Sequence, residues 1–399
     1  MTKQDLDFIL KVLQDESANS GDADWYSVMG YLELNRVSGP FYNNAVKLGI
    51  ELPPQVKRKC ANTLAYQKAR NAAMSEWAER IGAGLCKQGI KHAFLKGAIL
   101  SKYKIHRLDM TGQLNPMWKP HTALYEERLY TDGERTSNDI DILIDQKDIS
   151  KLSAILSALG FGQGYWDFNL NCFCALSRAE IVSRRMNRGE TAPYILKLEN
   201  GIIDFIEVDI NFSLDHLPGG DSVAYFLSDA QKYGGKLYGL EGTKFFLHLL
   251  LHQYKESTVY SMVRRGKDTE LYKYLDIYLY IKKGLPDYER LEKLITDLDL
   301  ETECFYVLHN AVEIFYNLRN DIQLVNFLKR APRDFKYTGE VSDPENKGKR
   351  YCWTKPLRER MTTLNGAPFL REISAGCYRG ITAENNGGSR FISKFTGRE

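Results

Sequence analysis

The sequence has few cysteines and no long apolar run. Seven cysteines are scattered over 399 residues, and an odd, dispersed set of this kind does not suit the disulfide framework of a small secreted domain. The longest apolar stretch, residues 245–251, is interrupted by His248 and falls far short of the roughly 20 residues that span a bilayer. Residues 1–15 also lack the pattern of a signal peptide. We therefore expect reduced thiols, a cytoplasmic location and no membrane insertion.

Neither sign of charge is in large excess. The 54 Lys and Arg residues against 51 Asp and Glu residues give a net charge of +3, which permits a nucleotide or nucleic-acid partner without requiring one. Three basic clusters, within residues 184–188, 264–267 and 347–360, resemble RNA-binding segments. Because such clusters more often lie on a solvated surface, nucleic acid is an allowed but not a favoured partner.

Several familiar motifs are missing or incomplete. The chain has no Gly-x4-Gly-Lys-Ser/Thr phosphate loop, and the glycines of residues 160–164 follow a helical pattern at the wrong spacing for a dinucleotide loop. Cys172 and Cys174 lack the second pair of ligands that a structural zinc site needs. His248 and His252 share a helical face, but no glutamate follows the first histidine, so they do not form a metalloprotease motif.

The apolar spacing divides the chain into three regions. Residues 1–85 repeat apolar side chains at intervals near 3.6, which predicts helices. Residues 86–235 contain short apolar runs, glycine turns and an Asn-Gly pair, which predict strands and a hairpin. Residues 236–399 return to helical spacing and end in a basic tail. We predict an α+β fold, with a small mixed β-sheet core flanked by N-terminal and C-terminal helical regions.

Paired acids in a strand pattern carry the main chemical signal. Residues 138–143 read Asn-Asp-Ile-Asp-Ile-Leu, and alternate residues of a strand point to the same face. Asp139 and Asp141 therefore project together, while the isoleucines bury the opposite face. Two carboxylates on one face repel each other unless a cation lies between them, and a hard divalent ion prefers oxygen ligands. Alone, the pair fits a solvated strand face equally well.

A second strand pattern adds further acids. Residues 206–210 read Ile-Glu-Val-Asp-Ile, so Glu207 and Asp209 share a face. If this strand lies beside the first, three or four carboxylates gather at one place. Such a cluster suits two metal ions roughly 3.5–4 Å apart. From the pattern alone, either Asp209 or Glu207 can be the third metal ligand.

A lysine-glycine turn precedes the acids. Residues 92–95 form a short apolar run, Lys96 and Gly97 follow, and residues 98–104 have a helical pattern. Glycine lets the backbone approach a ligand closely, and a helix N-terminus offers free N–H groups to a phosphate. The turn is a weak signal alone, but it gains weight from its position before the paired aspartates.

Together these motifs resemble the polymerase-β-like nucleotidyltransferase superfamily. The likeness is greatest to its poorly characterised bacterial branch, which has a Leu-Lys-Gly turn, an Asp-x-Asp strand and a third Asp. It covers residues 25–284 of this chain. Asn211 stands where that branch often has histidine, and the connection from Lys96 to Asp139 is unusually long. We therefore expect an insertion at residues 108–125.

The resemblance implies transfer of an NMP group from an NTP to a hydroxyl, with release of pyrophosphate. ATP is the favoured NTP, and the acceptor, whether a small metabolite, an antibiotic-like molecule, a protein side chain or an RNA end, stays open because fold does not fix it. The implied cofactor is a two-ion Mg²⁺ or Mn²⁺ site. The resemblance implies that metal binding and catalysis depend on Asp139, Asp141 and Asp209. It implies that the nucleotide is bound by Lys96, Gly97 and Arg135. The alternatives are a non-catalytic nucleotide- or partner-binding protein on the same scaffold, or an RNA-modifying toxin-like nucleotidyltransferase.

Overall fold

The N-terminal helices begin at recognisable capping residues. In the computed structural model, α1 (Lys3–Leu13) starts with a capping box between Thr2 and Asp5, which satisfies free N–H groups of the first turn. The side chain of Asp24 caps α2 (Trp25–Leu34) in the same way. Helix α3 (Ser38–Lys47) follows. Helix α4 (Pro54–Lys87) begins with a proline, which suits the first turn because a backbone N–H there has no acceptor within the helix. This confirms the predicted N-terminal helical region.

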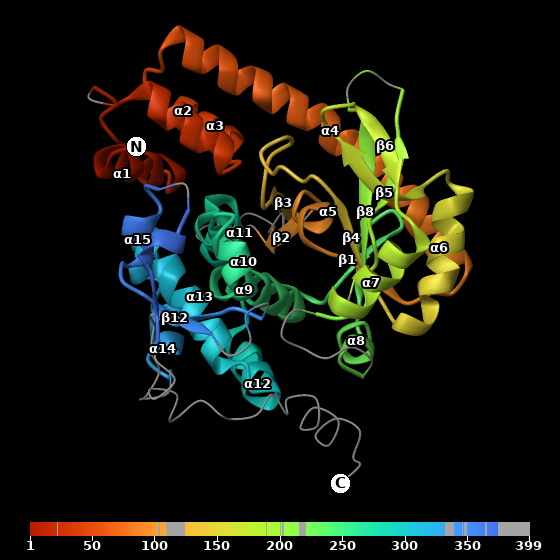
Figure 1. Cartoon of the computed structure of the whole chain (residues 1–399). Helices are drawn as coiled ribbons and strands as arrows, with labels where there is room; N and C mark the ends of the chain where they lie inside the picture. Colours follow the sequence, from red (N-terminus) through yellow and green to blue (C-terminus); the bar gives the residue numbers. More distant parts are fainter. Residues whose placement is uncertain are drawn as a thin grey trace, which may run out of the picture.

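The structure describes the chain in segments: residues 1–21, 23–102, 104–108, 124–188, 190–199, 201, 203–214, 221–331, 339–344, 346, 349–363 and 365–373. The architecture is α+β, with an eight-stranded mixed sheet between helical regions (Figure 1), as predicted. The strand order is β6-β5-β7-β8-β4-β1-β10-β9. Their bounds are β1 (His92–Phe94), β4 (Ile140–Ile144), β5 (Gly162–Asp167), β6 (Cys172–Ala175), β7 (Tyr194–Lys197), β8 (Phe205–Asn211), β9 (Gln231–Gly234) and β10 (Leu237–Gly239).

The two acid-bearing strands are neighbours at the centre of the sheet. Strand β4 is buried along its whole length and runs parallel to β8. Strand β8 alternates between buried and partly exposed residues, and it pairs antiparallel with β7. Gly201 lies between β7 and β8 at φ +70°, as the predicted hairpin requires, while Asn200 lies outside the described residues. The sheet continues into β10, past the predicted core boundary at residue 235, whereas the division into three domains stays a prediction.

Helices flank the sheet on both sides. Helix α6 (Ile149–Ala158) contacts the C-terminal half of α4 on one side (Figure 1), and the C-terminal helices lie on the other. Helix α5 (Lys96–Leu100) is shorter than the helix predicted over residues 98–104, because the chain enters β2 at Lys104. Two more short helices, α7 (Arg178–Arg188) and α8 (Asp221–Phe226), follow β6 and β8.

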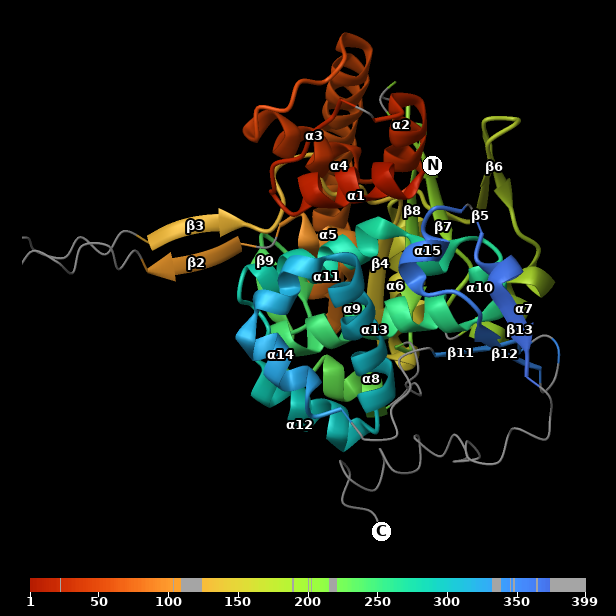
Figure 2. The ribbon, with the colours of Figure 1, turned by 90° about the vertical axis from the view of Figure 1, so that its left-hand side faces the viewer.

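A hairpin lies within the unusually long connection from Lys96 to Asp139. Strand β2 (Lys104–Leu108) pairs antiparallel with β3 (Leu124–Arg128). Figure 2 shows the pair extending away from the rest of the fold. The predicted insertion at residues 108–125 therefore begins and ends on these strands, and its interior, residues 109–123, lies outside the described residues.

The C-terminal region is helical, as predicted, but also contains a small sheet. Helices α9 and α11 are buried over most of their residues. The elements are α9 (Gly242–Thr258), α10 (Tyr260–Val263), α11 (Leu271–Lys282), α12 (Tyr288–Leu298), α13 (Glu301–Ile314), α14 (Ile322–Leu328), α15 (Leu357–Arg360), β11 (Glu340–Ser342), β12 (Arg350–Trp353) and β13 (Leu370–Glu372), with the last three forming the sheet. The basic tail from residue 374 lies outside the described residues.

Two predicted absences can be compared with the described part of the chain. There, no helix has the length and apolar character needed to cross a membrane. Six of the seven cysteines lie in that part, and each is free of a disulfide.

Candidate functional site

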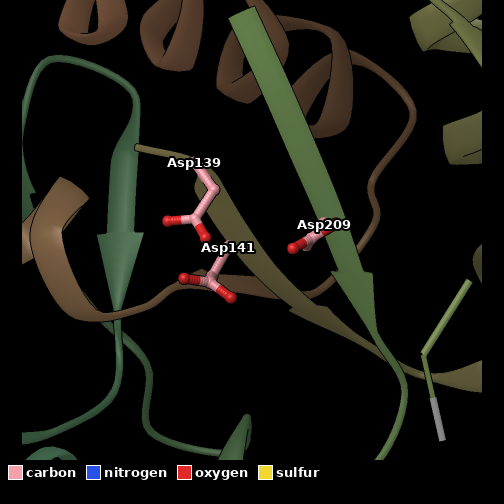
Figure 3. Close-up of side chains that lie close together, drawn as sticks. All are labelled: Asp139, Asp141 and Asp209. Carbon is pink, nitrogen blue, oxygen red and sulfur yellow. The ribbon is translucent and has the colours of Figure 1, made fainter. Parts of the chain in front are cut away.

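Three aspartates meet where β4 and β8 lie side by side. The parallel register places Asp141 opposite Asp209, and Asp139 directly precedes β4. Each carboxylate offers an oxygen, and the three oxygens lie within 4.8 Å of one another. Figure 3 shows the side chains converging on one space from the two strands. The predicted cluster therefore exists, with the geometry of a candidate metal site.

Burial makes this cluster electrostatically unfavourable on its own. Asp141 is only 4% exposed. Desolvation and the charge of Asp141 raise the pKa of Asp139, and desolvation together with Asp141 and Asp139 raises the pKa of Asp209 well above its usual value. A divalent cation bound to the three carboxylates would offset this repulsion. Hard oxygen ligands of this kind suit Mg²⁺ or Mn²⁺, so the donor set fits the predicted metal.

Glu207 lies at the edge of the cluster. It shares a face of β8 with Asp209, two residues further along. Desolvation and the charges of Asp139 and Asp141 raise the pKa of Glu207 to about 7. The group whose oxygens come within 4.8 Å of one another consists of the three aspartates without Glu207. The geometry therefore favours Asp209 as the third ligand, and the choice between them stays a prediction.

The lysine-glycine turn lies directly beside the acids. Strand β1 pairs with β4, so the turn after β1 reaches the end of β4 that carries the aspartates. Nζ of Lys96 lies 3.0 Å from Oδ1 of Asp141, and the backbone N–H of Leu95 donates to the carbonyl oxygen of Asp141 at 3.0 Å. Lys96 has φ +44°, an uncommon conformation for a residue with a side chain. The Lys96 side chain and the Leu95 backbone thus both attach the turn to Asp141.

Gly97 allows the chain to pass close to the loop that carries Asp139. A Cβ atom at position 97 would lie 2.5 Å from Oγ and 2.6 Å from Cβ of Ser137, closer than atoms of this kind approach. The Ser137 hydroxyl in turn donates to the carbonyl oxygen of Asp139 at 2.9 Å. The glycine is therefore needed for packing at this point as well as for the predicted approach of a ligand.

Helix α4 of the N-terminal region holds the same loop. Nε of Arg70 donates to the carbonyl oxygen of Ser137 at 3.1 Å, and its Nη2 donates to that of Asn138 at 3.2 Å. Nδ2 of Asn71 donates to the carbonyl oxygen of Arg135 at 2.8 Å. Sequence reasoning missed both residues, because they lie more than 60 positions from their partners in an ordinary polar helix.

Arg135 lies near the acids in a buried network. Its Nε and Nη2 atoms donate to the two carboxylate oxygens of Asp276 at 2.7 and 2.8 Å, and Tyr130 donates to the same carboxylate at 2.7 Å. The Arg135 guanidinium also lies 4.6 Å from the ring centre of Tyr272. Asp276 raises the pKa of Arg135 against the effect of burial, so the group stays charged. The assignment of Arg135 to the nucleotide stays a prediction.

The basic cluster at residues 347–360 does not present unpaired charge in the part that the structure describes. Each of its five described cations forms an ion pair with a carboxylate: Lys349 with Glu372, Arg350 with Glu340, Lys355 with Glu359, Arg358 with Asp7 and Arg360 with Asp268. Lys267, from a second cluster, lines a cleft together with Asp139. This distribution gives no support to an RNA-binding surface at residues 347–360.

Comparison with known proteins adds one relationship. Residues 123–316 match the profile of a family described as an uncharacterised nucleotidyltransferase. The matched segment includes the three aspartates and Arg135, whereas Lys96 and Gly97 precede it. Searches among curated proteins and among solved structures found no match.

Proposed function

Because residues 123–316 belong to the uncharacterised nucleotidyltransferase family, we propose that this protein transfers an NMP group from an NTP to a hydroxyl group of an acceptor. The observation that carries the proposal is the convergence of Asp139, Asp141 and Asp209, whose carboxylate oxygens lie within 4.8 Å of one another. ATP is the favoured donor, and the acceptor remains open.

The proposed metal ligands are the same three carboxylates. Asp139 and Asp141 would hold both ions of a two-ion Mg²⁺ or Mn²⁺ site, and Asp209 would hold one. When bound, such ions stabilise the negative charge on the attacking and leaving oxygens of a phosphoryl transfer. The high cost of leaving these buried carboxylates ionised without a cation supports this assignment.

The residues of the chain have separate roles in the proposed reaction. Lys96 and Gly97 bind the phosphates, and Arg135 contributes positive charge nearby. The acceptor oxygen bonds to the α-phosphorus, the bond from that phosphorus to the α–β bridging oxygen breaks, and pyrophosphate leaves with the bonding electrons. The hydroxyl proton passes to the carboxylate of Asp209. The products are thus the nucleotidylated acceptor, pyrophosphate and one proton.

A binding measurement tests the proposal without knowledge of the acceptor. A non-hydrolysable ATP analogue with Mg²⁺ is titrated calorimetrically into wild type, into Asp139→Asn/Asp141→Asn and into Asp204→Asn. Asp204 is an exposed aspartate just before β8 and is the matched control. We expect micromolar, Mg²⁺-dependent binding by wild type and by the control, and a loss of at least tenfold in the double variant.

The other outcomes are equally informative. Absence of NTP binding by well-folded wild type would refute the proposal. Binding that is metal-independent and unchanged in the double variant would support the alternative of a non-catalytic nucleotide-binding protein. If binding behaves as expected, incubation with labelled NTPs and candidate acceptors, including RNA, distinguishes a small-molecule enzyme from a toxin-like one.

A further inference from the structure

A cleft opens beside the aspartate cluster, on the side of the C-terminal helices. Its volume is about 170 Å³, and its lining includes Lys96, Gly97 and Asp139 on one side. Residues of α9 and α11 form the opposite side. The cleft thus lies between the proposed nucleotide site and the helices α9 and α11.

Cations from all three regions of the chain line this cleft. Arg36 comes from the N-terminal helices, Lys96 and Arg135 come from the core, and Lys267 and Lys273 come from the C-terminal helices. Lys273 is only 8% exposed, although an ammonium group is rarely buried without a compensating partner. Carboxylates at Glu256 and Glu270 supply that compensation.

Arg36 is fixed at the cleft by contacts to both other regions. The Asn35 side-chain oxygen accepts a hydrogen bond from the backbone N–H of Leu271 at 2.9 Å, which attaches this part of the chain to the start of α11. With its amide oxygen facing Arg36, Asn138 accepts from Nη1 and Nη2 at 3.2 and 2.9 Å. The Arg36 guanidinium also lies 5.2 Å from the ring centre of Tyr272. It is therefore held next to the loop that carries Asp139.

Lys267 reaches the cleft from the opposite side. It lies in the short 3₁₀ helix before α11 (Lys267–Thr269), and its Nζ is 2.7 Å from Glu270. Its side chain keeps 30% of its surface exposed. Arg135 differs, because its guanidinium is buried and bonded to both oxygens of Asp276, whereas Lys267 pairs with a single carboxylate and stays partly exposed.

We propose that this cleft binds the β- and γ-phosphates of the nucleotide, and that Arg36 and Lys267 make the site selective for triphosphates. The inference rests on the proposed function, which places the α-phosphate at the aspartates. The β- and γ-phosphates then extend past Lys96 into a space lined by five cations and by the carboxylates of Asp139, Glu256 and Asp276. Guanidinium and ammonium groups bind phosphate oxygens, and the cations outnumber the carboxylates there. A nucleoside monophosphate does not reach that far.

The test compares two nucleotides on two pairs of variants. Two nucleotides are titrated, each with Mg²⁺, into wild type, Arg36→Met and Lys267→Met. They are AMP and the α,β-methylene analogue of ATP. The matched controls are Arg319→Met and Lys293→Met. Each removes an exposed cation that is also paired with a carboxylate but does not line the cleft. Thermal unfolding verifies that each variant is folded. We expect each cleft variant to bind the ATP analogue at least tenfold more weakly, with AMP binding unchanged and both controls like wild type.

The outcomes separate this inference from the proposed function. If both cleft variants bind the ATP analogue as tightly as wild type does, the inference is overturned and the proposed function stays intact. Equal weakening for AMP and for the ATP analogue also overturns it, because the cations would then act on the α-phosphate or on the fold. No binding by folded wild type overturns the proposed function and the inference together.

Discussion

Replacing Asp209 by asparagine should stabilise the protein in the absence of metal. The three carboxylate oxygens lie within 4.8 Å of one another, and two unit charges at that distance repel each other by about 3.5 kcal/mol at an effective dielectric constant of ~20. Lys96 offsets part of this through its ion pair with Asp141, and protonation relieves another part. We therefore expect Asp209→Asn to raise the free energy of unfolding at pH 8 by about 1–3 kcal/mol.

The sign of the pH dependence follows from the raised pKa of Asp209. Below the pKa of the unfolded chain, about 4, Asp209 is protonated in both states, so wild type and variant should differ little. As the pH rises, the unfolded state releases the proton first, because burial and the neighbouring carboxylates keep the folded pKa high. Wild-type stability then falls with rising pH. The advantage of the variant should therefore grow from pH 4 to pH 8.

Magnesium should reverse the order of stability. An ion that binds only the folded state stabilises it by RT ln(1 + [L]/Kd), which is about 4.1 kcal/mol at one thousand times Kd and exceeds the advantage expected for the variant. Urea and thermal unfolding in EDTA and in Mg²⁺, at several pH values, measure both effects, with Asp204→Asn as the control. If Asp209→Asn were less stable than wild type at pH 8 in EDTA, the account of the cluster as a site of stored repulsion would be wrong.

Two further substitutions test the surroundings of the cluster. Gly97→Ala should weaken binding of the ATP analogue at least tenfold in calorimetry, since the added Cβ would lie 2.5 Å from Oγ of Ser137. The double variant Gly97→Ala/Ser137→Gly should recover part of the affinity. Unchanged affinity in the single variant would contradict the packing argument. Asp276→Asn should lower the free energy of unfolding by about 3–5 kcal/mol, because it leaves the buried Arg135 guanidinium without its partner charge. Urea denaturation measures this free energy. A decrease of less than about 1 kcal/mol would contradict the role of Asp276 as the partner charge.

The aspartate cluster could be predicted because local patterns determine it. Alternation along residues 138–143 places Asp139 and Asp141 on one face, and the Asn-Gly pair before Phe205 indicates the hairpin that leads into β8. The pairing of β4 with β8 then needs only one assumption about which strands are neighbours. A one-residue slip in that register would turn Asp209 to the other face, so the prediction was sensitive, and the structure confirms it.

The cationic cleft could not be predicted in the same way. Arg36 and Lys273 stand in polar or ordinary helical surroundings, where nothing in the local spacing distinguishes them from surface cations. Lys267 belongs to the basic cluster at residues 264–267, but that cluster alone indicates only a charged segment. Only long-range packing brings them together. The hairpin of β2 and β3 was missed for a different reason, since its strands are short and flank a polar segment. The small sheet of β11, β12 and β13 likewise consists of strands of three or four residues, too short to carry a clear period-two pattern.

The hydrogen bond between Asn35 and Leu271 also has a consequence for synthesis. It joins residues 236 positions apart, so the partner of Asn35 leaves the ribosome roughly 10–50 s after it, at translation rates of about 5–20 residues per second. During that interval the N-terminal helices and the aspartate strands can form, but the wall of the cleft that α11 provides does not yet exist. A nascent chain would therefore contain its aspartates, Arg36 and Lys96 well before Lys267 and Lys273, the two cleft cations of the C-terminal region. Nucleotide affinity would arise as one of the last properties of the folding chain.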